Sequence, residues 1–143
     1  MIRFVLDTDT VSLLERGDAM LLQRIARHDA RQLATTVITV EEQMTGRLAT
    51  LRAAKTLLQQ VIAYRRLADT TEALRHLAIL PFTEPAIQRY EELWALKLNV
   101  GKMDLRIAAI ALELGATVVT RNLRDFTRVP GLTCEDWSAA TES

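Results

Sequence analysis

The sequence predicts a three-layer α/β/α domain built on a mainly parallel sheet of about five strands. Three observations lead to this fold class. Short apolar, β-branched runs suited to buried strands alternate with longer stretches of helical periodicity, which is the order that parallel sheets require. The chain has 143 residues, a length that suits one domain. Its composition is 49% hydrophobic and 25% charged, as in water-soluble globular proteins.

Charge and composition exclude several classes of protein. The formal net charge is zero, so any nucleic-acid site must be a local patch. No apolar run approaches the roughly 18 residues of a membrane span, and no signal-peptide pattern is present. Cys134 is the only cysteine, so no disulfide forms within the chain. We therefore expect a cytoplasmic protein without a membrane partner.

The first half of the chain reads as two strand-and-helix units. Ile2 to Leu6 is a short apolar strand, followed by the polar run from Asp7 to Thr10 and a helical turn. Asp18 can cap a second helix. A second buried strand lies within residues 32–40, and the next helix is expected to start at Glu41.

The middle of the chain is mostly helical. Residues 47–66 and 70–77 have apolar positions at helical spacing, and the first of these stretches is rich in arginine. Residues 78–80 form a short third strand. A helix then opens with Glu84 and Pro85, as first-turn residues should. Its expected core stripe comprises Ile87, Tyr90, Trp94 and Leu98.

The stretch from Lys102 to Phe126 organises the chain. It begins with a helix carrying Asp104 in its first turn and reaches Gly115, where a left-handed residue would end the helix. A buried strand follows, and at its end comes a polar loop. A last, edge-like strand at residues 132–137 holds Cys134, read as a buried structural thiol. We expect one domain over residues 1–138 and a frayed tail over 139–143.

Several acids follow strand ends and are expected to meet at one edge of the sheet. Asp7 follows strand one, Glu42 lies in the first turn after strand two, and Asp104 starts the helix that leads into strand four. Asn122 and Asp125 follow strand four. Crowded carboxylates repel one another unless a cation neutralises them. Oxygen ligands without histidine or cysteine suit Mg²⁺ or Mn²⁺.

Each of these residues also has a purely structural interpretation. Asp104 could be a plain helix cap, and Asp9 is read as one. Glu41 is expected on a solvated face. Asp125 could pair with Arg121 or Arg124. The two histidines are expected at the surface, away from the acids.

At this point the chain resembles a known family. The segments LDTDTVSLL, ITVEEQMTG and KMDLRIAAIALELGATVVTRNLRDF, with the final EDW strand, are similar to the PIN domain, specifically the VapC-type toxins of type II toxin–antitoxin modules. The resemblance implies that Asp7, Glu42 and Asp104 are the metal-binding acids. Asn122 stands where many relatives have a fourth acid, and Thr120 matches a hydroxyl before it.

The resemblance also implies an activity and partners. It implies a Mg²⁺-dependent endoribonuclease that forms a homodimer and is inhibited by a VapB-like antitoxin. Arg121, Arg124 and the arginine-rich helices would hold the RNA backbone. Asn122 lacks the charge for a second tightly held ion, and Asp125 is the candidate to replace it. Both residues are therefore placed with the catalytic group, together with Thr120.

Two alternatives stay open at the level of sequence. Asp7-Thr8-Asp9-Thr10 matches the D-x-D-x-T opening of HAD-type phosphatases, but the lysine and paired acids that such enzymes need further on are missing. The other alternative is a non-catalytic PIN-like module that only binds RNA or a partner. Retention of three acids argues against it, and metal-dependent cleavage would discriminate.

Overall fold

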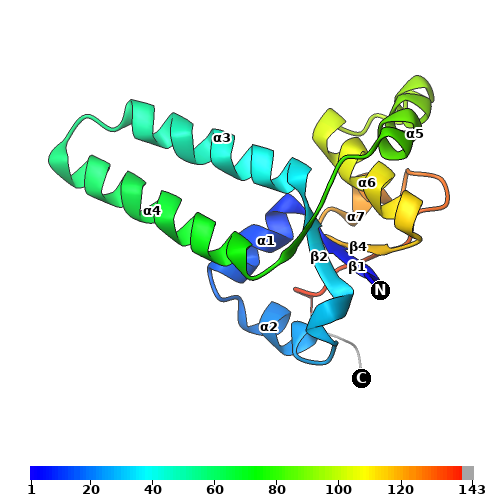
Figure 1. Ribbon diagram of the computed structural model, residues 1–143, viewed down its shortest axis with the longest axis horizontal. Helices are drawn as coiled ribbons and strands as arrows, with labels where there is room; N and C mark the ends of the chain where they lie inside the picture. Colours follow the sequence, from blue (N-terminus) through cyan, green and yellow to red (C-terminus); the bar gives the residue numbers. More distant parts are fainter. Residues whose placement is uncertain (140–143) are drawn as a thin grey trace.

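The computed structural model describes residues 1–139 and contains a five-stranded sheet with helices on both faces (Figure 1). Every strand pairing is parallel, and the order is β3-β2-β1-β4-β5, so the first strand is central as predicted. The expected tail lies outside the described residues, apart from residue 139. The strands are β1 (Phe4–Leu6), β2 (Leu33–Thr36), β3 (Ala78–Leu80), β4 (Thr117–Val119) and β5 (Cys134–Glu135).

Helices fill the connections between the strands. They are α1 (Thr8–Glu15), α2 (Ala19–Ile25), the short 3₁₀ turn η1 (Ala30–Gln32), α3 (Val37–Ala53), α4 (Leu57–Arg75), α5 (Glu84–Ala95), α6 (Lys102–Leu114) and α7 (Leu123–Phe126). Within residues 1–139, none of these helices is long and apolar enough to cross a bilayer.

The sheet buries both of its faces. Side chains alternate along a strand, so neighbours on β1 enter different cores. Val5 packs into a cluster with Ile107 of α6, whereas Leu6 packs into a second cluster with Val11 of α1. Two separate cores therefore clamp β1 and fix its carboxyl end, where Asp7 follows.

The second strand is shorter than predicted, and the helix after it starts earlier. Strand β2 ends at Thr36, whose hydroxyl accepts a hydrogen bond from the backbone N–H of Thr39 at 3.3 Å. This side-chain cap starts α3 at Val37, although the β-branched residues that follow favour a strand. The predicted helix start at Glu41 is thus wrong, and Glu42 lies in the second helical turn.

Helices α3 and α4 form a long hairpin that projects from the body of the sheet (Figure 1). The chain breaks between them at residues 54–56, where Thr56 and Gln59 form a capping box. The predicted helices over 47–66 and 70–77 are therefore parts of these two longer helices. The outer part of α4 exposes large apolar side chains, namely Leu57, Leu58, Val61, Ile62 and Tyr64.

Helix α5 is rotated relative to the predicted core stripe. Ile87 is 39% exposed and Trp94 is 47% exposed, so the prediction that these two are core residues is wrong. Ala86 and Leu93 are buried instead. The small Ala86 allows α5 to approach α6 closely, which turns the larger Trp94 outward.

The last strand is shorter than expected, with Cys134 only partly buried. Trp137, beyond the strand, is buried and stacks on His28 with ring centroids 4.5 Å apart. His28 is therefore a packing residue, whereas His76 is exposed as predicted.

Candidate active site

Asp7 is held at the centre of the sheet edge. Its backbone N–H donates to Val119 of β4 at 3.1 Å, which continues the pairing of β1 with β4. Its Oδ1 accepts from the backbone N–H of Thr10 at 2.9 Å, so Asp7 caps α1. Only 3% of the residue is exposed. Burial raises the pKa of this carboxyl, and hydrogen bonds from Thr120 and Thr10 oppose the rise.

The surroundings of Asp104 show that the predicted acids lie close together. It lies in the first turn of α6, and its pKa is raised to about 6. Burial is the largest cause of the raised pKa, followed by the negative charges of Asp7, Glu42 and Asp125. Carboxylates from four distant segments therefore act on one another at this edge of the sheet. A group with such a displaced pKa and named charged neighbours is a candidate functional residue.

Glu42 is held by the hydroxyl of Thr8, a contact that the sequence reasoning missed. The Thr8 hydroxyl donates to Glu42 Oε1 at 2.6 Å and lies 3.1 Å from the Thr39 hydroxyl. Thr8 directly follows Asp7, and this position was the available signal. Glu41, the preceding residue on α3, is exposed. The structure thus directs the second acid, and not its neighbour, toward the site.

Asn122 and Asp125 lie on one face of the loop after β4, as their spacing predicts. The Asn122 amide nitrogen donates to Asp125 Oδ2 at 2.9 Å and lies 3.5 Å from Asp104 Oδ2. The buried Thr120 hydroxyl accepts from the backbone N–H of Asn122 at 2.8 Å. Arg128, which the sequence reasoning missed, reaches Asp125 Oδ1 at 3.4 Å. Asp125 therefore pairs with Arg128 and not with Arg121 or Arg124.

Arg121 is paired at the mouth of the site. Its Nε and Nη2 donate to the two carboxylate oxygens of Asp9 at 2.6 and 2.8 Å. This bidentate pair lowers the pKa of Asp9. The interpretation of Asp9 as a helix cap is wrong, because Asp7 caps α1 and Asp9 lies in its first turn. Arg124 is exposed on α7.

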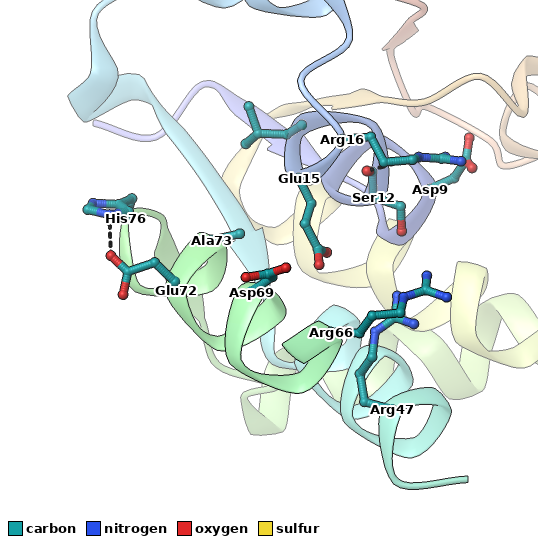
Figure 2. A pocket seen from close by; sticks show the side chains of 11 residues that line it. Asp9, Ser12, Glu15, Arg16, Arg47, Arg66, Asp69, Glu72, Ala73 and His76 are labelled. Atoms are coloured by element: carbon teal, nitrogen blue, oxygen red, sulfur yellow. Dashed lines mark hydrogen bonds and ion pairs between the residues drawn. The ribbon is translucent and has the colours of Figure 1, made fainter. Parts of the chain in front are cut away.

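Two large hollows are lined by residues close in sequence to the acids. The first, here called the Arg47 hollow, measures about 730 Å³ and lies between α1 and the α3–α4 hairpin (Figure 2). The second, here called the Trp94 hollow, measures about 610 Å³ and lies between the end of α5 and the start of α6. Asp9 lines the first, and Gly101 and Leu105, on either side of Asp104, line the second. Neither is lined by Asp7, Glu42 or Asp104.

The acids fit a hard divalent cation by their chemistry. Over residues 1–139, no three Asp, Glu, His or Cys side chains already surround a point where an ion could sit. Donors from the protein hold oxygens of these acids instead: the Thr8 hydroxyl on Glu42 and the Asn122 amide on Asp125. Burial is the first cause of the raised pKa of Asp104, and the charges of Asp7, Glu42 and Asp125 raise it further. An oxygen-only donor set with excess negative charge suits Mg²⁺ or Mn²⁺.

This fold and edge are those of a known class of protein. The chain belongs to the PIN domain family, whose profile matches residues 4–132. Within the family it is most clearly similar to VapC ribonucleases. It is 31% identical over 141 residues to the tRNA(fMet)-specific endonuclease VapC of Salmonella typhimurium, covering 96% of this chain and 99% of the relative. It is 29% identical over 142 residues to ribonuclease VapC2 of Haemophilus influenzae, covering 96% and 99%.

Solved structures agree with this kinship. DNA-bound VapBC from Salmonella typhimurium has a chain with a TM-score of 0.79 and 28% identity, covering 96% of this chain and 99% of that chain. VapBC2 from Rickettsia felis, bound to a promoter DNA fragment, has a TM-score of 0.75 at 23% identity, covering 96% and 99%, and supports the fold alone. The phosphatase alternative is therefore wrong, since the whole fold and order of motifs are those of VapC proteins.

Proposed function

We propose that this VapC-type endoribonuclease uses a divalent cation, Mg²⁺ or Mn²⁺, held by Asp7, Glu42 and Asp104. The observation that carries the proposal is the pKa of about 6 at Asp104, raised by burial and by the charges of the other acids. Such crowding costs stability unless a cation or protons neutralise it. When bound, the cation would polarise a phosphoryl oxygen and lower the pKa of a water molecule.

The residues around this edge have separate roles in the proposed reaction. Asp7 is fixed by its cap and by burial, so it presents one rigid ligand oxygen. Glu42 is less buried and is oriented by Thr8, so it can accept a proton from an attacking water. Asn122, which lies between Asp104 and Asp125, and Asp125 itself would face the other oxygens of the scissile phosphate. Thr120 positions this loop through its bond to the Asn122 backbone.

The arginines at the mouth would bind the RNA backbone. Arg121 projects from the loop after β4 and is already oriented by Asp9, while Arg124 is exposed one turn away. Each phosphate contact contributes a salt-dependent share of affinity. Arg121→Ala should weaken RNA binding and reduce the salt dependence by about one phosphate. The Arg124→Ala variant serves as a parallel test of the second contact.

The similarity to a tRNA(fMet)-specific endonuclease makes transfer RNA the first substrate to examine. Purified protein would be incubated with total cellular RNA, once with Mg²⁺ and once with chelator. The new 5′ ends would then be mapped in both samples. A metal-dependent cut at one position would support the proposal. Cleavage that persists in excess chelator would contradict it, and complete absence of cleavage would favour the non-catalytic module.

We further propose that a VapB-like antitoxin covers the exposed apolar surface of α4. Leu57 is 84% exposed and Leu58 is 69% exposed, which is unusual for a stable free surface. Similar solved structures are VapBC complexes, which supports such a partner. Leu58→Asp should abolish capture by the antitoxin encoded beside this protein without changing the melting temperature. A homodimer is also expected, and sedimentation of the purified protein tests it.

A further inference from the structure

The Trp94 hollow presents an exposed aromatic ring next to basic side chains, near the first turn of α6 that carries Asp104. Trp94, 47% exposed, lines the hollow, and the Lys102 ammonium lies 5.2 Å from its ring centroid. A second pair lies beside the first: the guanidinium of Arg106, one turn after Lys102 on α6, lies 5.0 Å from the ring centroid of Tyr90, one turn before Trp94 on α5. The centroids of the Tyr90 and Trp94 rings are 6.4 Å apart, and their planes are inclined by 28°. Rows of aromatic rings interleaved with cations are typical of surfaces that bind single-stranded nucleic acid.

Charge distinguishes the two hollows. The Arg47 hollow is lined by acids and arginines in near balance, and Arg47 itself donates to Thr70, which donates to Glu15. Figure 2 shows Glu15 of α1 pointing toward α4, which carries Asp69 and Arg66 on this side. The Trp94 hollow has Lys97 in its lining and no acid. A polyanion is therefore favoured in the Trp94 hollow, because the four carboxylates of the Arg47 hollow offset its three arginines, whereas no acid offsets Lys97.

The loop that lines the Trp94 hollow is hydrogen-bonded to Arg128, which also contacts Asp125 of the proposed active site. Lys97 and Asn99 have left-handed backbone conformations, with φ of 54° and 61°, which non-glycine residues seldom adopt. The Arg128 guanidinium donates to the Asn99 carbonyl at 2.9 Å and reaches Asp125 at 3.4 Å. One side chain thus links the loop to a residue of the proposed active site. Gly101 and Leu105 bring the hollow within one helical turn of Asp104.

We propose that the Trp94 hollow is a subsite for a nucleobase of the single-stranded RNA substrate, next to the scissile phosphate. The base stacks on Trp94, while Lys97 and Lys102 contact the flanking phosphates. This inference rests on the proposed ribonuclease function and adds where the substrate lies. The subsite gives affinity with little sequence preference, because every base has a stacking face.

The test is equilibrium binding of a short fluorescent single-stranded oligoribonucleotide, measured in chelator so that no metal-dependent step takes part. The same oligomer without bases is the second probe. Trp94→Ala should weaken binding of the base-bearing oligomer roughly 5- to 150-fold, the range found for loss of one stacked base. Trp94→Phe should lose much less, and the abasic oligomer should bind all three proteins alike.

Ile87→Ala is the matched control, since Ile87 is exposed two turns earlier on α5 and does not line the hollow. It should leave RNA binding unchanged. Equal losses for base-bearing and abasic probes, or no loss in Trp94→Ala, would overturn the subsite. So would loss of self-association in both Trp94→Ala and Ile87→Ala, which would show that a second copy covers this face. Cleavage that persists in chelator, or in Asp7→Asn, would contradict the proposed metal-dependent function separately and would leave this binding measurement interpretable.

Discussion

A single neutral side chain, Asn122, donates toward two carboxylates, with its amide nitrogen 2.9 Å from Asp125 Oδ2 and 3.5 Å from Asp104 Oδ2. The amide stands between acids that would otherwise repel each other. In the proposed active site it therefore takes over part of the neutralising role of a cation. We expect one tightly held Mg²⁺ in the RNA-free protein and a second ion that binds only with the RNA phosphate.

Asn122→Asp should reverse this balance. The substitution removes the donor and adds a further negative charge, so the metal-free protein should lose about 1–2 kcal/mol of unfolding free energy. A second Mg²⁺ should then bind without RNA. Calorimetric titration of both proteins measures this, with Asn122→Ser as the variant that loses the donor without gaining charge. Two equally tight ions in the RNA-free wild-type protein would refute the account.

Asp104→Asn should change how stability depends on pH. The pKa of Asp104 rises from 3.8 to about 6 on folding, so ionisation destabilises the native state increasingly between these two values. The metal-free variant should equal wild type near pH 4 and exceed it by about 1 kcal/mol, or roughly 3 °C, above pH 6.5, a figure reduced for partial exposure. Thermal unfolding in chelator across this range tests the sign. A variant less stable than wild type at pH 7 would contradict it.

Asp125→Ala should lower RNA cleavage well beyond its effect on folding. Asp125 accepts a hydrogen bond from the Asn122 amide and forms an ion pair with Arg128. Its loss therefore leaves both side chains without this partner near the proposed scissile phosphate. We expect at least a tenfold fall in the single-turnover rate with a loss of about 1 kcal/mol in stability. Arg128→Ala separates the two effects, because it removes the ion pair and keeps the carboxylate. Unchanged cleavage by Asp125→Ala would remove this residue from the site.

The two neighbouring glutamates form an internal control. Glu42 accepts a hydrogen bond from the Thr8 hydroxyl at 2.6 Å, whereas Glu41 is exposed on α3. Glu42→Gln should reduce metal-dependent cleavage a hundredfold or more, in the range of losing a proton-transfer group. Glu41→Gln should stay within about twofold of wild type. Similar losses in the two variants would show that general charge, and not a positioned carboxylate, governs activity.

The periodicity of apolar residues predicted the fold class well, because the burial of those residues determines which segments become strands and helices. The alternation of strands and helices required a parallel sheet, and the acids after its strands had to meet at one edge. The start of α3 could not be predicted from propensity, because one hydrogen bond to Thr36 overrides the β-branched residues after it. The exposure of Trp94 depends on how closely α5 approaches α6, which no pattern within α5 reveals.

The candidate site was predicted in its acids but not in its supporting contacts. Asp7 follows a strand end and Asp104 lies in the first turn of a helix, so sequence position indicates them, and Glu42 lies one turn further into its helix than predicted. Thr8 bonds Glu42 across 34 residues of sequence, and Arg128 bonds the Asn99 carbonyl across 29. Such contacts depend on the angles between elements, which a single sequence does not specify.

The most direct test of the shared metal site is RNA cleavage by Asp7→Asn, measured with its melting temperature. Asp7 is 3% exposed and its pKa is raised mainly by burial, so an isosteric neutral side chain relieves a cost in the metal-free fold. Cleavage in Mg²⁺ should fall to the level seen in chelator, while the metal-free melting temperature should stay equal or rise. Cleavage that remains at wild-type rate in folded Asp7→Asn would contradict it.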